Sequence, residues 1–424
     1  MNMKDMDKGQ LQALKAELEQ AYAAFKEKGA SLNMARGKPC KDQLDLSNEM
    51  LKMPITEYKD GEGVDIRNYG GLPGIPEARK LFAEIMGVQT ENVILGGTAS
   101  LNLMYDMVSR AYTHGVLPGK TPWCKLDKVK FLCPSPGYDR HFAITEYFGF
   151  ELIAVSMNPC GPDMDAVEEL IKDPAVKGIW CVPMYSNPDG ITYSDDTVRR
   201  LAAMKPAADD FRIFWDNAYG LHHLDHNDRD YLLNIYDECK KLGVEDRVYI
   251  FNSLSKITLA GGSISAMAMS KPNFDWTCDQ LGIQTISYDK VNQLRHCRFF
   301  PNLAALEEHM KKHGAILKKK FDIVLDYLNK EIAPLGIGTW QNPKGGYFVS
   351  FFSLDGCAKR IIALCKEAGV VLTGAGATYP YGNDPHDSNI RIAPSFPPEA
   401  ELCQAMDVFC VAVKLASVEK LLAE

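Results

Sequence analysis

Along the middle of the chain, short apolar runs and segments with a helical period of apolar residues follow one another in regular alternation. Between residues 77 and 255, short apolar runs such as NVIL, KVKFLCPSP and FRIFW alternate with amphipathic segments such as SLNLMYDMVSRAY and DDTVRRLAAMKP. Apolar runs of this length predict strands that are buried on both faces, and the amphipathic segments predict helices that cover them. This alternation is typical of a mainly parallel sheet between helical layers.

The two ends of the chain have a different pattern of apolar and polar residues. The first thirty residues have a helical period that ends at Gly29, and SLNMARGKPC follows as an irregular loop. Beyond about residue 300, three helical segments and the strands GGYFVSFF and NIRIAPS predict a smaller α+β unit. We therefore expect an N-terminal helix and loop that join the small domain (1–60), a large domain (61–310) and a small C-terminal domain (311–424).

The composition narrows the class of protein. Hydrophobic residues make up 46% of the 424 residues and charged residues 24%, which is typical of a globular chain with a large core. The net charge of -8 and the lack of a Lys/Arg run argue against a nucleic-acid partner. No apolar run is long enough to span a bilayer. The twelve cysteines are scattered without a CxxC pair, so we expect reduced thiols and a cytoplasmic location.

Candidate chemistry lies where the strands end, because open α/β sheets bind ligands at the carboxyl ends of their strands. Gly96, Gly97, Thr98, Ala99 and Ser100 follow NVIL, and their backbone N–H groups suit an anion at a helix N-terminus. An ordinary turn capped by Ser100 is the competing interpretation.

Three further strand ends carry polar or aromatic side chains. Tyr138 can stack on a flat ligand, although packing on the core explains a single aromatic residue better. Asn187 can donate from its amide to a ligand oxygen, but Asn-Pro also suits an ordinary turn. Asp216 follows an apolar run, so its carboxylate needs a cation or N–H partner, unless it only caps a turn.

Lys256 lies between a predicted buried strand and a glycine-rich turn, with no carboxylate close in sequence. A lysine that is partly desolvated at the mouth of a sheet has a lowered pKa, so its neutral amine can form a Schiff base. Asp216, on the neighbouring strand end, would suit the ring nitrogen of a pyridinium cofactor. The four strand ends together predict such a cofactor far more strongly than any one of them.

The chain resembles the fold-type-I pyridoxal-phosphate (PLP) enzymes of the class I/II aminotransferase family. The matching motifs are YGGLPGIPEARKLFA, GGTASLNLM, PSPGYDRHF, SNPDG, DNAYG, SLSK, GGYF and RIAPS. Three segments are most similar to the bacterial type Ic aspartate aminotransferases. The resemblance implies the α/β fold of the PLP-dependent transferases of fold type I. Its large domain has a mainly parallel seven-stranded sheet covered by helices, and a small α+β domain follows.

The resemblance also implies roles around the cofactor, pyridoxal 5′-phosphate. Lys256 would form the internal aldimine and move the proton between the substrate α-carbon and the cofactor. Asp216 would pair with the pyridine nitrogen, Asn187 and Tyr219 would bond the phenolic oxygen, and Tyr138 would stack on the ring. The residues expected around the phosphate are Gly97, Thr98, Ala99, Ser100 and Ser253.

The resemblance places other residues at the substrate. Arg391 would bind the α-carboxylate, with a salt bridge between the domains as the alternative, and Asn187 would line the same site. Gly37 would close over the substrate. Tyr69 would reach the phosphate of a neighbouring subunit, which implies a homodimer with a shared active site. The implied partners are an L-amino acid, first aspartate or glutamate, and a 2-oxo acid, and no metal is expected.

One position departs from the family pattern. Where the family has a phosphate-binding arginine eight residues after the lysine, this chain has Ile264, so hydroxyls, amides or a distant cation must hold the phosphate. A dicarboxylate also needs a second cation. Lys290 is nearest the usual spacing, and Arg295, Arg298, Arg36 and Lys38 are further candidates, although a solvated helix face explains Lys290, Arg295 and Arg298 better when each is taken alone.

Two other functions remain open from the sequence. The same scaffold can carry β-elimination or C–S cleavage, because fold alone does not decide the reaction. A non-catalytic regulatory domain would need a basic DNA-binding module, and the residues before Ser31 are too few and not basic.

Overall fold

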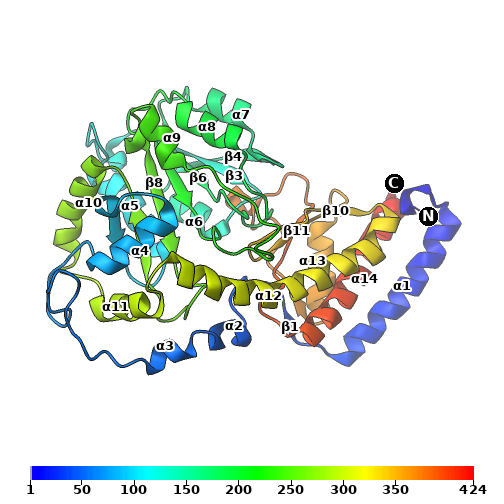
Figure 1. Cartoon of the computed structure of the whole chain (residues 1–424). Helices are drawn as coiled ribbons and strands as arrows, with labels where there is room; N and C mark the ends of the chain where they lie inside the picture. The colour runs from blue at the N-terminus through cyan, green and yellow to red at the C-terminus, as the bar shows by residue number, and fades with distance from the viewer. Residues whose placement is uncertain (1) are drawn as a thin grey trace.

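The computed structural model describes residues 2–424, which form a large lobe and a small lobe (Figure 1). Helix α12 (Leu303–Tyr327) runs from one lobe to the other. Its Leu306 and Met310 are buried in the core of the large lobe, and its Leu317 and Phe321 are buried in the core of the small lobe. The boundary expected at residue 310 thus falls inside a continuous helix, and as a domain boundary it stays a prediction.

An eight-stranded sheet forms the centre of the large lobe. Its strands lie in the order β2-β9-β8-β7-β6-β3-β4-β5, and β8, β7, β6, β3 and β4 are parallel to one another. The strand bounds are Val93–Leu95 (β2), Lys130–Ser135 (β3), Glu151–Asn158 (β4), Gly161–Pro162 (β5), Val176–Cys181 (β6), Arg212–Asp216 (β7), Val248–Ser253 (β8) and Ser265–Ala268 (β9).

Helices cover both faces of this sheet, as the apolar strand runs predict. In β7, Ile213 and Trp215 lie in one core and Phe214 lies in the other. Burial of each such side chain stabilises the fold by about 1.5–3 kcal/mol. The first core is covered by α4 (Pro76–Met86), α7 (Met164–Leu170), α8 (Asp195–Ala203), α9 (Ile235–Lys241) and α11 (Lys290–Phe299), and the second by α5 (Ser100–His114), α6 (Asp139–Tyr147) and α10 (Lys271–Gln284).

The mainly parallel sheet is confirmed, with one strand more than expected. The eighth strand, β5, is a two-residue edge that pairs antiparallel with β4. Strand β9 pairs antiparallel with both β2 and β8. Its sequence, SAMA, is short and has three small residues around Met267, so it lacks the continuous apolar run of the other central strands.

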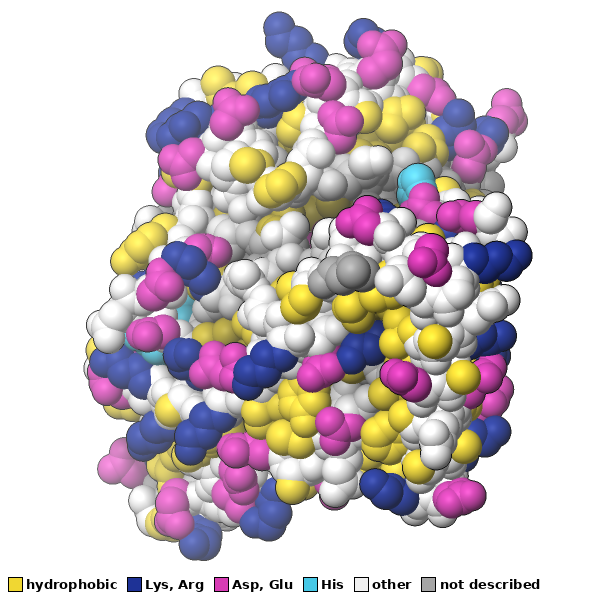
Figure 2. Space-filling model, turned by 90° about the vertical axis from the view of Figure 1, so that its right-hand side faces the viewer, with side chains coloured by type: hydrophobic (Ala, Val, Ile, Leu, Met, Phe, Trp, Pro, Cys, Tyr) yellow, Lys and Arg dark blue, Asp and Glu magenta, His cyan; other side chains and the backbone are white. Residues whose placement is uncertain are grey.

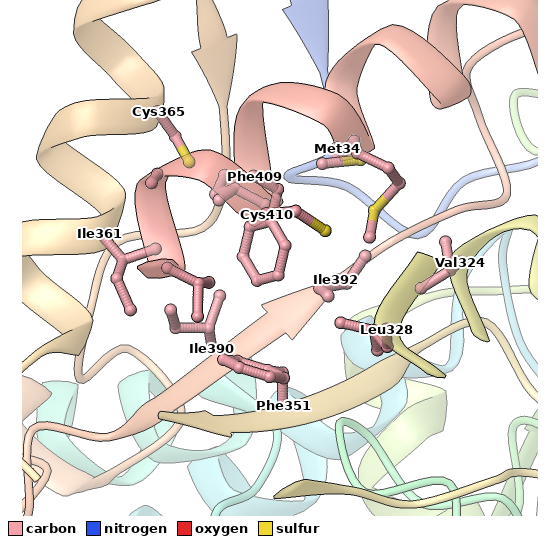
Figure 3. Packing of buried hydrophobic residues seen from close by; sticks show 14 of the residues in the cluster. Met34, Val324, Leu328, Phe351, Ile361, Cys365, Ile390, Ile392, Phe409 and Cys410 are labelled. Atoms are coloured by element: carbon pink, nitrogen blue, oxygen red, sulfur yellow. The ribbon is translucent and has the colours of Figure 1, made fainter. Parts of the chain in front are cut away.

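The small lobe is built on a three-stranded antiparallel sheet of β10 (Gly338–Trp340), β11 (Val349–Ser353) and β13 (Asn389–Ile392). Figure 3 shows Phe351, Ile390 and Ile392 of this sheet packed against Phe409 and other side chains from the surrounding helices. These helices are α12, α13 (Ala358–Glu367) and α14 (Glu399–Ala423). The register pairs Ser350 with Arg391, which fixes the arginine on a buried strand.

The N-terminal segment belongs to both lobes. Helix α1 (Lys8–Lys28) packs on α14, and it ends at Gly29 in the left-handed conformation, as the sequence predicts. Strand β1 (Leu32–Asn33) then pairs with β12 (Val370–Val371) of the small lobe. Short helices α2 (Lys41–Asp45) and α3 (Asn48–Lys52) continue below α12 towards the large lobe (Figure 1).

The surface gives no sign of a polyanion-binding face on the side that can be seen in Figure 2. This side carries α1, and basic and acidic side chains are mixed across it. Within residues 2–424, no helix is both long and apolar enough to cross a bilayer.

Candidate active site

The site lies at the carboxyl ends of neighbouring strands in the large sheet. Asp216 is the last residue of β7, Ser253 is the last residue of β8, and Lys256 follows three residues later. Asn187 follows the next strand, β6, after a short connection. Parallel strands bring their carboxyl ends to one edge, so residues from three separate segments of the sequence share one edge of the sheet.

Asp216 is buried and has one ordered partner. Its Oδ2 lies 2.9 Å from Nε2 of His141, whose ring stacks on Trp180 at 4.4 Å between centroids. Its Oδ1 is buried and has no hydrogen-bond partner in the described chain. An unpaired carboxylate oxygen in an apolar setting is costly unless a donor fills the place. A protonated ring nitrogen would be such a donor.

Lys256 is half-buried beside two tyrosines. Its Nζ lies 4.9 Å from the ring centroid of Tyr219, and its backbone carbonyl accepts a hydrogen bond from the Tyr347 hydroxyl at 3.3 Å. Burial raises the pKa of Tyr138 to about 12, and the nearby Lys256 charge acts in the opposite direction. The lysine amine therefore lies over the Tyr219 ring and close enough to Tyr138 to act on its pKa.

Tyr219 and Asn187 connect the lysine to Arg391. Tyr219 is buried, and burial together with the Asp216 charge raises the pKa of its hydroxyl. Arg391 and the Asn187 amide act in the opposite direction. The Asn187 Oδ1 accepts from Nη1 of Arg391 at 3.1 Å, so its amide nitrogen is the group that acts on Tyr219 and that can donate to a ligand oxygen.

The expected phosphate end is made of small residues, hydroxyls and a helix terminus. Helix α5 begins at Ser100, so its N-cap is Ala99 rather than Ser100, and the Ala99 side chain cannot satisfy the free N–H groups. The Ser265 hydroxyl donates to the Gly97 carbonyl, which fixes the loop, while Thr98 is exposed beside it. The Ser253 and Ser255 hydroxyls lie 2.8 Å apart.

Ile264, at the position where the family pattern has an arginine, lies in the core. Its side chain is 2% exposed and packs in the core of the large lobe, and its carbonyl accepts from the Leu254 backbone. A charged side chain would not fit this position without losing those contacts. The position eight residues after Lys256 therefore offers no cation to an anion, and whether hydroxyls and backbone N–H groups or a distant cation take that role stays a prediction.

Arg391 lies on β13 of the small lobe and reaches the large lobe. It is 8% exposed, and its guanidinium lies 4.9 Å from the ring centroid of Phe348. Nη1 donates to Asp139 Oδ1 at 3.0 Å, and Nη2 donates to the Thr373 hydroxyl at 3.2 Å. A salt bridge between the lobes was the alternative interpretation, and the structure contains one.

Gly37 packs against the same aromatic residue. A Cβ at Gly37 would lie 2.4 Å from Cζ of Phe348, so only glycine allows the loop to approach the ring that faces Arg391. Lys38 in the same loop points away, with its Nζ 3.8 Å from the ring centroid of Phe396. The loop therefore packs on the aromatic ring beside Arg391, whereas Lys38 lies over Phe396.

Two expected residues lie apart from this group. Tyr69 is 78% exposed, and Lys290 packs against Gly71, two residues further along. Lys290 is 4% exposed, and its Nζ has no hydrogen-bond partner in residues 2–424. Of the other candidates, Arg298 donates to the Glu57 carbonyl at 2.8 Å, and Nε of Arg295 is buried without a partner in the described residues.

Sequence reasoning missed three residues of the site, namely His141, Asp139 and Thr373. His141 lies three residues after Tyr138 at the start of α6, so it faces the same side as Tyr138, and this helical spacing is a usable signal. Thr373 approaches Arg391 from a distant loop, and no local pattern indicates it.

The described residues fit pyridoxal phosphate. Asp216 has an unpaired buried oxygen for the ring nitrogen, Asn187 and Tyr219 can bond the phenolic oxygen, and Lys256 supplies an amine. The loop before α5 offers N–H groups to the phosphate. Tyr138 lies edge-on to His141, which leaves its ring at the border of the site.

Comparison with known proteins agrees with this geometry. A family model described as aspartate amino-transferase matches residues 6–424. The chain is 44% identical over 420 residues to an aspartate aminotransferase of Corynebacterium glutamicum, covering 99% of this chain and 97% of that protein.

Solved structures extend the comparison. A crystal structure of an aspartate transaminase from Corynebacterium glutamicum superposes with a TM-score of 0.97 at 44% identity, over 99% of both chains. An α-aminoadipate aminotransferase from Thermus thermophilus, solved with N-(5′-phosphopyridoxyl)-L-leucine, has a TM-score of 0.73 at 18% identity over 93% of both chains. The second likeness shows the fold alone.

Proposed function

The chain belongs to the aspartate aminotransferase family, and from this premise we propose that it transfers an amino group between L-aspartate or L-glutamate and a 2-oxo acid, with pyridoxal 5′-phosphate as cofactor. The observation that supports this most is the position of Lys256, beside Tyr219 and on the strand edge that also carries Asp216. When bound, the cofactor supplies an aldehyde that condenses with amines and a ring that takes up an electron pair.

The residues of this chain then have separate tasks. Asp216, held by His141, stabilises a protonated ring nitrogen. Lys256 moves a proton at the substrate α-carbon, since it is the amine at the mouth of the sheet. Arg391 binds the α-carboxylate and fixes the orientation of the breaking C–H bond. Gly37 allows the loop to close over Phe348 and exclude water.

We also propose a homodimer whose two copies complete each other's sites. Tyr69 is the residue that would reach the phosphate of the other copy, and it is 78% exposed in this chain. Other large apolar side chains are exposed on the same lobe, including Ile283, Ile286 and Tyr147. Sedimentation velocity on the holoenzyme would reveal a monomer if this proposal were wrong.

The experiment that tests the function is a donor and acceptor panel with the holoenzyme. We expect oxaloacetate and glutamate to form from L-aspartate and 2-oxoglutarate, and Lys256→Ala is the inactive control. Absence of amino transfer from all common donors would contradict the proposal. Release of pyruvate and ammonia without an oxo-acid acceptor would instead favour an eliminating enzyme.

A further inference from the structure

One ion pair connects the two lobes across the substrate side of the site. Asp139 is the first residue of α6 in the large lobe, and Arg391 lies on β13 in the small lobe. Asp139 Oδ1 lies 3.0 Å from Nη1 of Arg391. The guanidinium that is proposed to bind the substrate α-carboxylate therefore already binds a carboxylate of the chain itself.

The contacts of Arg391 show which places remain for a ligand. Nη1 donates to Asp139 and Asn187, and Nη2 donates to Thr373. The Asp139 carboxylate pairs with the Arg391 guanidinium through only one of the guanidinium nitrogens. Nε is buried and has no partner within residues 2–424. A carboxylate that binds across both terminal nitrogens needs one of the two N–H groups of Nη1, and Asp139 and Asn187 occupy both of them.

We propose that Asp139 holds the place of the substrate α-carboxylate on Arg391 and leaves it when a substrate binds. The proposal rests on the proposed function, in which Arg391 binds that carboxylate. Asp139 is an internal competitor, so it lowers the affinity for every substrate that carries an α-carboxylate.

The exchange of Asp139 for a substrate carboxylate on Arg391 is nearly balanced in free energy. The empty site needs an anion, because an unpaired arginine that is 92% buried is costly. The Asp139 carboxyl is one-third exposed and makes a single-nitrogen contact, so its pair with Arg391 is weak. A free carboxylate can bind with two parallel hydrogen bonds, which is stronger. Asp139 loses little on leaving, since it stays at the positive N-terminus of α6 and its carboxyl is partly in water.

The position of Asp139 also explains why it acts on the substrate rather than on the fold alone. It directly follows Tyr138, which borders the cofactor ring in the proposed function. Its charge contributes to the raised pKa values of both Tyr138 and Tyr219. The carboxylate thus faces the interior of the site from the large lobe, opposite the strand that carries Arg391.

The test is equilibrium binding of succinate, a dicarboxylate without an amino group, to holoenzyme variants by calorimetry. We expect Asp139→Asn and Asp139→Ala to bind succinate roughly three- to tenfold more tightly than wild type, the effect of removing one partly exposed competing charge. The matched control is Asp195→Asn, which also neutralises the first residue of a helix, but on α8 and in a pair with Arg199. It should leave succinate affinity unchanged.

Two results would overturn the inference. Unchanged affinity in both Asp139 variants would mean that Asp139 does not compete, and weaker binding would mean that it orients Arg391 for the substrate. The apparent KM for aspartate should fall with the succinate Kd. A crystal structure of wild-type holoenzyme with succinate gives a readout that needs no variant, because Asp139 should then lie beyond hydrogen-bond distance of Arg391.

Failure of the inference can be separated from failure of the proposed function. Succinate binding requires no amino transfer, and Arg391→Gln should abolish it. If wild type binds succinate in this way but transfers no amino group from any donor, the proposed function fails while the competition stands. If amino transfer occurs and the Asp139 variants bind succinate no more tightly, only the competition fails.

Discussion

The two ends of the proposed cofactor site are built in different ways. At the ring-nitrogen end, Asp216 is buried, pairs with His141 and is backed by the stacked Trp180. At the phosphate end, the chain offers glycines, hydroxyls and the start of α5, and Ile264 fills the core where the family pattern has an arginine. At the ring-nitrogen end, a single chain supplies the negative charge that the cofactor needs. At the phosphate end, the chain supplies backbone dipoles and hydrogen-bond donors.

This difference follows from what each end must hold. A single buried proton on a ring nitrogen needs one fixed negative charge, and an aspartate that is oriented by a histidine provides it. A phosphate has several oxygens and can be held by many N–H groups at a helix terminus. Loss of one cation at that end is therefore tolerable, while loss of the aspartate at the other end is not.

The largest expected effect belongs to Lys256, which lies between the two ends. Lys256→Ala should lower kcat for aspartate roughly 10⁴-fold or more, because no other amine in the site can move the α-proton. Steady-state kinetics with added cofactor measures the loss. Activity within tenfold of wild type would mean that another base acts. Lys271→Ala, which removes an exposed lysine at the start of α10, is the matched control.

Restoring the family arginine tests the phosphate end. Ile264→Arg should lower the free energy of unfolding by about 3–5 kcal/mol, because it places an unpaired charge among packed apolar side chains. Urea unfolding of the holoenzyme gives the value. Cofactor retention should not improve. A stable variant that holds the cofactor more tightly would show that the phosphate end is incomplete rather than differently built.

Removing the support of Asp216 tests the ring-nitrogen end. His141→Asn should lower kcat about 10- to 100-fold while cofactor remains bound, since Asp216 loses the partner that orients it. Dialysis followed by absorbance reports retention separately from turnover. An unchanged kcat would mean that burial alone positions Asp216, and the contrast between the two ends would weaken.

Lys290 tests whether the phosphate end lacks a cation, because its buried amine can bind either the side-chain carboxylate of a substrate or the cofactor phosphate. Lys290→Gln should raise KM for aspartate and glutamate about tenfold, the loss of one ion pair, and leave KM for alanine nearly unchanged. The donor panel measures this. If cofactor retention falls while the preference for dicarboxylates persists, Lys290 belongs to the phosphate end instead.

The smallest effect concerns Asp189, a buried carboxyl without the histidine partner that Asp216 has. Burial raises its pKa to about 7, with the Ser350 hydroxyl acting in the opposite direction. Its pKa in the unfolded chain is about 3.9, so the unfolded state loses the proton first as pH rises. This group therefore costs stability increasingly between about pH 4 and pH 7, and by a constant amount above that range.

The measurement for Asp189 is calorimetric Tm against pH at constant ionic strength. Asp189→Asn should be more stable than wild type at pH 8, and the difference should shrink as pH falls through about 7 towards 4. Parallel curves for the two proteins would contradict the raised pKa.

The sequence predicts much of the fold because the central strands are continuous apolar runs, and both faces of a run such as Phe211–Trp215 are buried. Strand β9 escapes prediction, since its small residues are set by the neighbouring strands rather than by their own propensity. The strand-end rule brings Asp216, Ser253 and Lys256 to one edge.

What could not be predicted depends on contacts between distant segments. The Asp139–Arg391 pair joins residues 252 positions apart, and Thr373 reaches Arg391 from a loop. The buried state of Lys290 also follows from tertiary packing against Gly71, because a lysine in a polar helix reads as solvated. Contacts of this kind can be recognised only once the two lobes are placed together.

The account depends most directly on the amine that carries the cofactor. Borohydride reduction of the holoenzyme, followed by peptide mass spectrometry, identifies that amine. We expect one pyridoxyl group per chain, on the peptide that contains Lys256, and none on Lys290. A label on a different lysine, or no covalent label in a protein that holds the cofactor, would contradict the account.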